Sequence, residues 1–240
     1  MSWPAQIRHE SSALANKVTV SSRKLEHVRD IDATIDERAI AKRAARRFPV
    51  RRVLDLLGVL VLLIPGLPLM LLAALAIRLE GEGPCLYRQE RVGWKGRPFL
   101  LLKLRTMRVD AEADGQPRWA SHDDPRVTRV GRVLRRTRID ELPQLFNVLR
   151  GEMSLIGPRP ERPCFVEMLE HELPRYALRH CTLPGLTGYA QVHAGYTSSV
   201  TEARAKLACD LYYLLHQSLR LDLQILARTV PLIVTGRGAR

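Results

Sequence analysis

The sequence predicts a monotopic membrane protein of the α/β class, mostly α-helical, in which a re-entrant helix hairpin anchors a globular domain in the cytosol. Three observations support this fold class. Residues 56–77 form an uncharged run of 22 residues, long enough for a membrane helix of about 20 residues. Prolines interrupt this run at its centre. Lys and Arg residues lie on both sides of it.

The composition predicts a folded protein with an anionic partner. The chain of 240 residues carries 38 Lys and Arg against 25 Asp and Glu, a net charge of +13. This excess favours nucleic acid, anionic lipid or a phosphorylated small molecule. The 46% hydrophobic content excludes a disordered chain, and the four cysteines form no C-x-x-C motif of the kind that binds zinc. We expect buried or idle thiols from a reducing compartment.

The chain divides into three parts. Residues 1–50 form a polar N-terminal extension, residues 51–80 the re-entrant membrane helix, and residues 81–240 the globular domain. Within the extension, a helix-permissive run near residues 31–47 predicts a tail or short helix that leads to the membrane. Its basic residues are typical of a segment that binds lipid headgroups.

The centre of the apolar run contains Pro65, Gly66 and Pro68, which predict a kink at Pro65 or Pro68. Basic residues flank the run on both sides, within residues 42–52 and from Arg78 onward. Because Lys and Arg near a membrane segment prefer the cytosolic side, a helix that breaks at the prolines and returns through one leaflet satisfies both flanks. A kinked spanning helix and a buried helix of a soluble core are the alternatives.

Residues 81–240 are predicted to form a mixed α/β globule. In chain order we expect a turn-rich segment over residues 81–93, a strand over 97–104, a surface loop over 109–124, a helix over 127–147, a stiff loop over 155–163, an amphipathic helix over 165–180 with a break near Pro174, a turn over 184–188, and one or two helices over 201–230.

The densest basic cluster ends in two adjacent carboxylates. Six arginines lie within 13 residues, and most are expected to face solvent or headgroups: Arg126, Arg129, Arg132, Arg135, Arg136 and Arg138. Asp140 and Glu141 follow them. Such a pair can bind a divalent metal, or one member can act as a nucleophile or base; the alternative is a surface pair or a helix-start charge. Arginines bind phosphate, so this setting beside a membrane segment predicts phosphate chemistry at a bilayer surface.

Four further residues are candidates for the same site. Two prolines bracket Arg159 within residues 157–160 and fix the direction of its backbone. Lys103 and Arg105, at the end of the expected strand, add phosphate-binding capacity. Asp210 lies in an otherwise apolar helix, where it is either a buried counter-ion for an arginine or a site ligand.

These motifs resemble those of the bacterial sugar transferases of the monotopic phosphoglycosyl transferase family. The resemblance covers about residues 50–238 and includes the segments RRVLDLL, GPCLYRQERVG, FLLLKLRTM, DPRVTRVGRVLRRTRIDELPQLFNVLRGEMSLIGPRPE, LPGLTGYAQV and DLYYLLHQSLRLDLQIL. It implies the transfer of a sugar 1-phosphate from a nucleoside diphosphate sugar, such as a UDP-sugar, to polyprenyl (undecaprenyl) phosphate. That reaction starts surface polysaccharide assembly at the cytosolic face of the bacterial inner membrane.

The resemblance also implies a role for each candidate residue. Asp140 is the nucleophile of a covalent phosphosugar intermediate and a ligand of the cofactor Mg²⁺, and Glu141 orients the site or assists proton transfer. Asp210 supports the site. The residues that bind substrate phosphates are Arg135, Arg159, Lys103 and Arg105. The membrane kink is at Pro65 or Pro68, although the serine that usually precedes the kink proline is absent here. Residues 188–195 also lack an arginine that many family members carry.

The expected partners follow from the implied reaction. They are a nucleoside diphosphate sugar, polyprenyl phosphate, membrane lipid and a second copy of the chain in a homodimer, and they do not include nucleic acid. The rival interpretation is a membrane-anchored scaffold or anion-binding protein. It predicts a nucleic-acid affinity that falls steeply with salt, and no release of nucleoside monophosphate. The intact pair Asp140 and Glu141 favours the enzyme.

Overall fold

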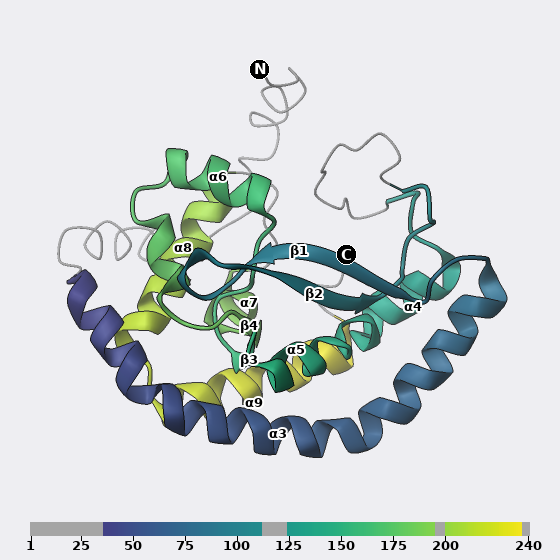
Figure 1. Ribbon diagram of the computed structural model, residues 1–240, viewed down its shortest axis with the longest axis horizontal. Coiled ribbons are helices and arrows are strands. Elements are labelled where there is room, and N and C mark those ends of the chain that lie inside the picture. The colour runs from purple at the N-terminus through teal and green to yellow at the C-terminus, as the bar shows by residue number, and fades with distance from the viewer. Residues whose placement is uncertain (1–35, 112–123, 195–199, 237–240) are drawn as a thin grey trace.

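The computed structural model describes residues 36–111, 124–194 and 200–236 (Figure 1). Most of the expected N-terminal extension, residues 1–35, and most of the expected surface loop, residues 112–123, lie outside the described residues. The described part is mostly helical, as predicted, and contains four short strands where the sequence predicted one. Its helices are α3 (Glu37–Glu80), α4 (Arg129–Thr137), α5 (Gln144–Arg150), α6 (Pro163–Glu172), α7 (Tyr189–His193), α8 (Val200–His216) and α9 (Leu219–Thr235). Its strands are β1 (Leu86–Val92), β2 (Pro98–Leu104), β3 (Ser154–Ile156) and β4 (Gly185–Thr187).

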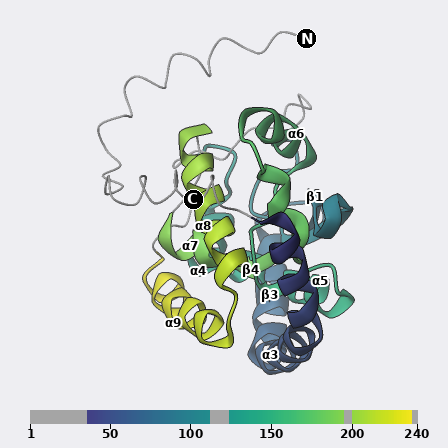
Figure 2. The same ribbon diagram turned by 90° about the vertical axis from the view of Figure 1, so that its left-hand side faces the viewer.

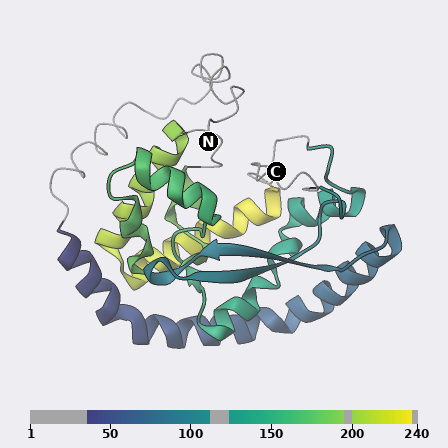
Figure 3. The same ribbon diagram turned by 45° about the horizontal axis from the view of Figure 1, so that its top comes forward.

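The apolar segment lies in α3, one continuous helix of 44 residues that contains Pro49, Pro65 and Pro68. The prediction of two helices broken at Pro65–Pro68 is therefore wrong at the level of the backbone. Proline removes a helix hydrogen bond and bends the axis without ending the helix here. Instead of a hairpin, α3 forms a wide arc whose two ends turn toward the same side (Figures 1 and 3). It also begins at Glu37, so the end of the expected extension belongs to the same helix.

Polar side chains fasten the N-terminal half of α3 to the globule. Arg51 donates hydrogen bonds to Thr182 Oγ1 at 3.1 Å and Ser154 Oγ at 3.3 Å. Asp55 accepts hydrogen bonds from Ser154 Oγ at 3.0 Å and from the backbone N–H of Leu155 at 2.9 Å. Both side chains are buried. A buried charge is stable only when it is paired and hydrogen-bonded, so these contacts fix α3 beside β3.

Arg52 points inward as well. Its guanidinium donates hydrogen bonds to the carbonyls of Val148 and, at 2.7 Å, Leu149, near the C-terminus of α5. The last carbonyls of a helix have no donor within that helix, and the Val148 carbonyl also accepts from the N–H of Gly151, just after α5. Arg51 and Arg52 belong to the basic flank that the sequence assigned to the cytosolic side of a membrane. In the structure, both residues join α3 to the rest of the protein.

The outer surface of α3 is apolar. It has a stretch long and apolar enough to cross a membrane, and only 22% of that stretch is buried in the described structure. This exposure disfavours the alternative of a soluble core helix. Helix α9 lies on the same side of the molecule as α3 (Figure 2). Its exposed large apolar residues recur at helical spacing: Leu219, Leu223, Leu226, Val230, Ile233 and Val234.

The globule contains two small sheets. Strands β1 and β2 pair antiparallel from Leu86 opposite Leu104 to Val92 opposite Pro98. The strand over residues 97–104 is thus confirmed, whereas the turn-rich segment over 81–93 contains a strand. Its sequence gives little signal because Val92 alone is buried, and β2 supplies the pairing that local sequence does not show. Strands β3 and β4 pair in parallel, so a short strand lies within the expected turn at residues 184–188.

The expected helix over residues 127–147 is two helices. Arg138 adopts a left-handed backbone conformation with φ of 60°, which ends α4, and a single 3₁₀ turn (Ile139–Glu141) precedes α5. The expected helix over residues 165–180 is broken near Pro174, as predicted: α6 ends at Glu172, and a 3₁₀ helix (Tyr176–Cys181) follows. The one or two helices expected over residues 201–230 are α8 and α9. Apolar residues of β2, α5 and the middle of α3 form one core: Val59, Leu101, Leu145, Val148 and Met153. This core supports the 3₁₀ turn.

Gly131 allows α4 to approach the end of β2. A Cβ atom at this position would lie 2.1 Å from the backbone oxygen of Thr106, which cannot move aside as a flexible side chain can. We therefore predict that Gly131→Ala lowers the free energy of unfolding by about 1–3 kcal/mol, through overpacking. At Gly81 an added Cβ would meet no atom within 4 Å, so Gly81→Ala is the matched control. Thermal unfolding in detergent measures both, and equal stability of the two variants would contradict the prediction.

Candidate active site

The two adjacent carboxylates lie in the 3₁₀ turn between α4 and α5. Thr128 begins α4 by accepting a hydrogen bond from the N–H of Gly131 at 2.9 Å, and the left-handed Arg138 ends the helix. This reversal turns Asp140 and Glu141 into the protein. They are only 5% and 8% exposed, respectively, which is rare for acidic residues unless they are paired. The surface-pair alternative is therefore wrong.

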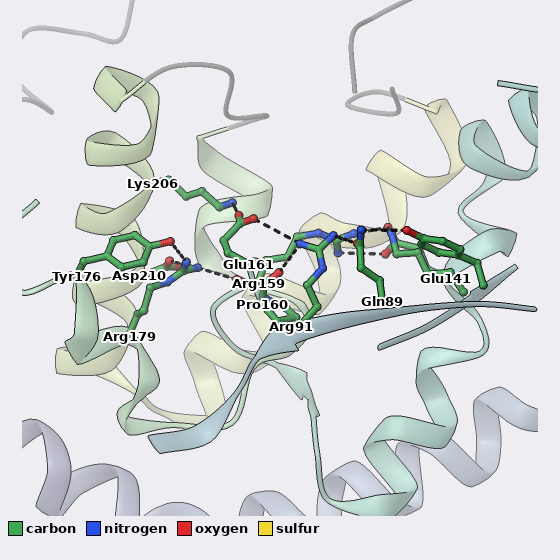
Figure 4. Close-up of polar contacts among 12 residues, drawn as sticks. Gln89, Arg91, Glu141, Arg159, Pro160, Glu161, Tyr176, Arg179, Lys206 and Asp210 are labelled. Atoms are coloured by element: carbon green, nitrogen blue, oxygen red, sulfur yellow. Dashed lines mark hydrogen bonds and ion pairs between the residues drawn. The ribbon is translucent and has the colours of Figure 1, made fainter. Parts of the chain in front are cut away.

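Glu141 is surrounded by basic side chains (Figure 4). Arg159 binds it with two arms, Nη2 to Oε1 at 2.5 Å and Nη1 to Oε2 at 3.1 Å. Lys103 Nζ donates to Oε1 at 3.3 Å, and Arg138 Nη1 lies 3.6 Å from the same oxygen. Burial raises the pKa of Glu141, but Arg159 and Lys103 outweigh burial and hold it well below its usual range. Glu141 therefore stays ionised at neutral pH.

Asp140 has the opposite environment. Its Oδ1 is buried and has no hydrogen-bond partner among the described residues. Burial is the largest influence on its pKa and raises it from 3.8 to about 6, with Glu141 adding to the rise and Lys103, Arg135 and Arg138 opposing it. Near neutral pH this carboxylate is therefore ionised, and its Oδ1 lacks a hydrogen-bond donor among the described residues. That combination suits a nucleophile or a metal ligand.

Neighbouring side chains hold the basic residues in place. Asn147 of α5 bridges β2, accepting from the N–H of Leu102 at 3.0 Å and donating to the carbonyl of Leu100 at 2.8 Å. This bridge sets Lys103 beside the 3₁₀ turn. Arg135 donates from Nε to Thr106 Oγ1 at 2.8 Å and contributes to the potential at Asp140.

Arg105 is a predicted phosphate-binding residue that points elsewhere. Its guanidinium donates to the carbonyls of Gly81 at 3.1 Å and Glu82 at 2.5 Å, just beyond the C-terminus of α3. Helix ends leave carbonyls without partners, and a cation there is favourable. The structure thus brings Lys103, Arg135 and Arg159 together with the acidic pair, whereas Arg105 binds the carbonyls at the end of α3.

Asp140 is also the residue that best fits a divalent cation. Among the described residues, no group of three or more His, Cys, Asp or Glu side chains could hold a metal ion. Mg²⁺ keeps several waters and uses one or two carboxylates together with substrate phosphates, so it needs no such group. The unpartnered Oδ1 of Asp140 meets this requirement.

Comparison with known proteins decides the family. Residues 46–236 match the model of the bacterial sugar transferases, which includes every residue of the site described above. The chain belongs to the bacterial sugar transferase family. The resemblance noted from the motifs is thus confirmed.

Two relatives of this bacterial sugar transferase are named as sugar-phosphate transferases, and a third is named as an exopolysaccharide production protein. One, from Aeromonas hydrophila, is a UDP-N-acetylgalactosamine-undecaprenyl-phosphate N-acetylgalactosaminephosphotransferase, 46% identical over 80% of this chain and 45% of its own length. Another, from Caulobacter vibrioides, is a UDP-glucose:undecaprenyl-phosphate glucose-1-phosphate transferase, 49% identical over 79% of this chain and 71% of its own. The Rhizobium leguminosarum exopolysaccharide production protein PSS is 40% identical over 79% of this chain and 98% of its own. The chain thus spans less than half of the Aeromonas relative and almost all of the Rhizobium one. The class of enzyme predicted from the sequence is confirmed.

Asp210 is a buried counter-ion for an arginine, one of its two predicted roles. Its Oδ2 lies 2.9 Å from Nη2 of Arg179, and the two side chains are 2% and 3% exposed. It lies in α8, and Arg179 lies in the 3₁₀ turn that follows α6. Asp210 therefore pairs with Arg179, which in turn donates to the backbone carbonyl of Arg159 at 2.7 Å.

Sequence reasoning missed a second charged cluster. Glu161, directly after the Pro-Arg-Pro sequence, accepts from Lys206 Nζ at 2.7 Å and lies 3.5 Å from Arg91 Nη1. Burial would raise the pKa of Glu161, but Lys206 and Arg91 lower it to about 2. The glutamate that ends the motif IGPRPE was the available signal. Arg91 and Lys206 gave none, because their pairing depends on the packing of β1 and α8.

The raised pKa of Asp140 predicts that the ionised carboxylate lowers stability. A group whose folded pKa exceeds its unfolded pKa stabilises the fold when protonated, and this stabilisation is lost as pH rises through about 6. We expect Asp140→Asn to raise the free energy of unfolding by about 1–3 kcal/mol at pH 8 and to change it little at pH 3.5, where aspartate is mostly protonated in both states.

Thermal unfolding of detergent-solubilised protein at both pH values measures this change. Asp110→Asn is the control, because Asp110 is exposed and paired only with Arg108 at 3.5 Å in the described structure. A loss of stability in Asp140→Asn at pH 8 would show that the neighbouring cations, rather than burial, dominate the site.

Proposed function

We propose that this sugar transferase moves a sugar 1-phosphate from a UDP-sugar to undecaprenyl phosphate, with release of UMP. The observation that carries the proposal is the contrast between the two adjacent carboxylates. Three cations surround Glu141, whereas the buried Oδ1 of Asp140 has no hydrogen-bond partner among the described residues. The names of the relatives support the substrates, since they specify UDP-sugars and undecaprenyl phosphate. The product would start a surface polysaccharide.

In the first step an oxygen of Asp140 attacks the phosphorus that carries the sugar. A bond forms between this oxygen and the phosphorus, and the bridging oxygen leaves with UMP. In the second step a phosphate oxygen of undecaprenyl phosphate attacks the same phosphorus. The aspartyl–phosphorus bond breaks, which returns the carboxylate and gives undecaprenyl diphosphate-sugar. Neither step needs a proton from Glu141, whose low pKa fits an orienting role better than proton transfer.

The basic side chains around Glu141 position the phosphates. Lys103, Arg138 and Arg159 present N–H groups at one place, and an incoming diphosphate can share them with the carboxylate of Glu141. In phosphoryl transfer, positioning and charge neutralisation provide most of the rate enhancement. Mg²⁺ held by Asp140 and the substrate phosphates would add further neutralisation of the diphosphate charge.

Helices α3 and α9 would form the membrane-facing surface. Contacts at both ends of α3 join it to the same globule, through Arg51 near the N-terminal end and through Ile77 packed on Leu104 near the C-terminal end. A helix that crossed the bilayer would carry these two ends to opposite faces. The contacts therefore support an α3 that enters from the cytosolic face of the bacterial inner membrane and returns to it, with α9 in the interface.

The alternative is a catalytically weak scaffold or anion-binding protein on the membrane. Burial of two adjacent carboxylates costs stability, and a phosphate-binding surface would need no acidic residues. The open oxygen of Asp140 therefore favours the enzyme.

The transfer reaction has a direct test. We predict that the purified protein, with Mg²⁺ and undecaprenyl phosphate, releases UMP from at least one of a panel of UDP-sugars. Asp140→Asn should reduce the rate by about 10³-fold or more and abolish the covalent adduct with a radiolabelled sugar phosphate. Because the attacking group is the carboxylate, kcat/KM should fall as pH decreases below about 6. Full activity of Asp140→Asn would overturn its role as nucleophile.

The position of α3 has a second test. We predict that single cysteines at Arg46 and Glu82, both exposed at opposite ends of the apolar run, react with a membrane-impermeant maleimide only from the cytosolic side. The measurement compares spheroplasts with inverted vesicles, in a background without the four native cysteines. A cysteine introduced into a periplasmic loop of another membrane protein is the control for labelling from outside. Labelling of one position from the periplasm would instead support a spanning helix.

A further inference from the structure

We propose that Arg179 is a positioning residue of the transferase site: it fixes the backbone of the Pro-Arg-Pro loop so that the Arg159 side chain reaches Glu141. This inference rests on the proposed function, because it concerns a residue that would bind the phosphates. Arg179 itself is buried behind the loop and does not contact Glu141 in the described structure (Figure 4). Its effect on the reaction must therefore pass through Arg159.

The arms of the Arg179 guanidinium reach two different elements. Nη2 donates to the backbone carbonyl of Arg159 at 2.7 Å and lies 2.9 Å from Oδ2 of Asp210. Nη1 donates to the hydroxyl of Tyr176 at 2.5 Å, and the guanidinium carbon lies 4.9 Å from the centre of the Tyr176 ring. These contacts leave Arg179 little freedom to rotate. The carbonyl of Arg159 is therefore held by a charged donor whose own position is fixed.

The neighbouring carbonyls of the loop are held as well. The N–H of Gly185 donates to Pro158 at 2.9 Å, and Arg91 Nη1 donates to Pro160 at 3.1 Å. The carbonyl of Glu161 accepts from the N–H of Val92 at 2.9 Å. Every carbonyl from residue 158 to residue 161 thus has a donor. At Arg159, the residue whose side chain reaches Glu141, that donor is Arg179.

A purely structural role would not require these charges. A buried ion pair such as Arg179–Asp210 adds little stability compared with well-packed apolar side chains of similar size. What the guanidinium provides is a directed donor at one backbone carbonyl, and a small rotation of that peptide unit would swing the Arg159 side chain away from Glu141. The two-armed contact of Arg159, at 2.5 Å and 3.1 Å, depends on that direction.

Helix α8 extends this support. Lys206 and Asp210 are four residues apart on it, so they lie on one face. Lys206 holds the side chain of Glu161, and Asp210 holds Arg179. One helix face therefore positions two consecutive parts of the loop, which explains why acidic and basic residues occur on a helix that is otherwise packed in the core.

The test is a double-mutant cycle between Arg179 and Arg159. Arg179→Lys keeps the positive charge beside Asp210, so the protein should still fold, but it loses the planar guanidinium that donates to the Arg159 carbonyl and to Tyr176. In the wild-type background we expect kcat/KM for the UDP-sugar to fall by about 10- to 100-fold. In the Arg159→Ala background the same substitution should change kcat/KM, and the Kd of the UDP-sugar, by less than about twofold.

Two measurements separate this role from general destabilisation. Tyr213→Phe removes an equally buried hydrogen bond that does not involve residues 158–161, from the Tyr213 hydroxyl to Asp222 Oδ1 at 2.8 Å, and it should leave kcat/KM within about twofold of wild type. The loop amides, those of Gly185 and Val92 that donate to the carbonyls of Pro158 and Glu161, should show faster hydrogen exchange in Arg179→Lys and not in Tyr213→Phe.

The possible outcomes distinguish the two proposals. An equal loss of kcat/KM in both backgrounds, or no loss in either, would overturn the positioning role of Arg179. Unchanged exchange of the loop amides would do the same, without any need for turnover. If the wild-type protein releases no UMP while the loop amides respond as expected, the proposed function fails and the structural part of the inference stands.

Discussion

The ion pair between Arg159 and Glu141 is the interaction on which the site depends. It joins the loop before α6 to the turn before α5, two segments that no strand pairing connects directly. Lys103 reaches the same carboxylate from β2, so three separate parts of the chain meet at one buried acid. A buried charge without partners is costly, and each of these cations must therefore be held in place by its own neighbours. Asn147 does so for Lys103, and Arg179 does so for Arg159.

This arrangement gives two adjacent carboxylates different properties. Glu141 takes up the nearby cations and stays ionised, whereas burial leaves Asp140 with a raised pKa and an open oxygen. Neither residue could have both properties, because a carboxylate bound by three cations is a poor nucleophile and an open one cannot organise the cations. The proposed chemistry thus follows from an asymmetry that the dipeptide alone does not show.

The sequence predicted those parts of the site that local motifs encode. Asp140, Glu141, Lys103 and Arg159 lie together as expected, because each belongs to a motif with stiff or regular backbone. Arg105 lies only two positions after Lys103, yet its side chain donates to carbonyls just beyond the end of α3. The direction of the Arg105 side chain depends on the long-range packing of that helix, which the local sequence does not show. Arg179 was not predicted as a site residue for the same reason, because its contacts with Arg159 and Asp210 are long-range. The continuous α3 was also not predictable, since proline signals a bend or a break with equal strength.

The same packing relates the site to the proposed membrane surface. At Gly66, between the two prolines of α3, the helix lies close to α5: a Cβ atom there would be 3.8 Å from Leu145 and 4.0 Å from Leu142. Leu142 directly follows Glu141, so the acidic pair lies one residue from the contact with the middle of the apolar arc. In the proposed topology the arc lies between the site and the hydrocarbon core at that point. A lipid phosphate could then reach Asp140 at headgroup depth without leaving the bilayer, which gives the continuous, bent helix a role that a straight anchor could not fill.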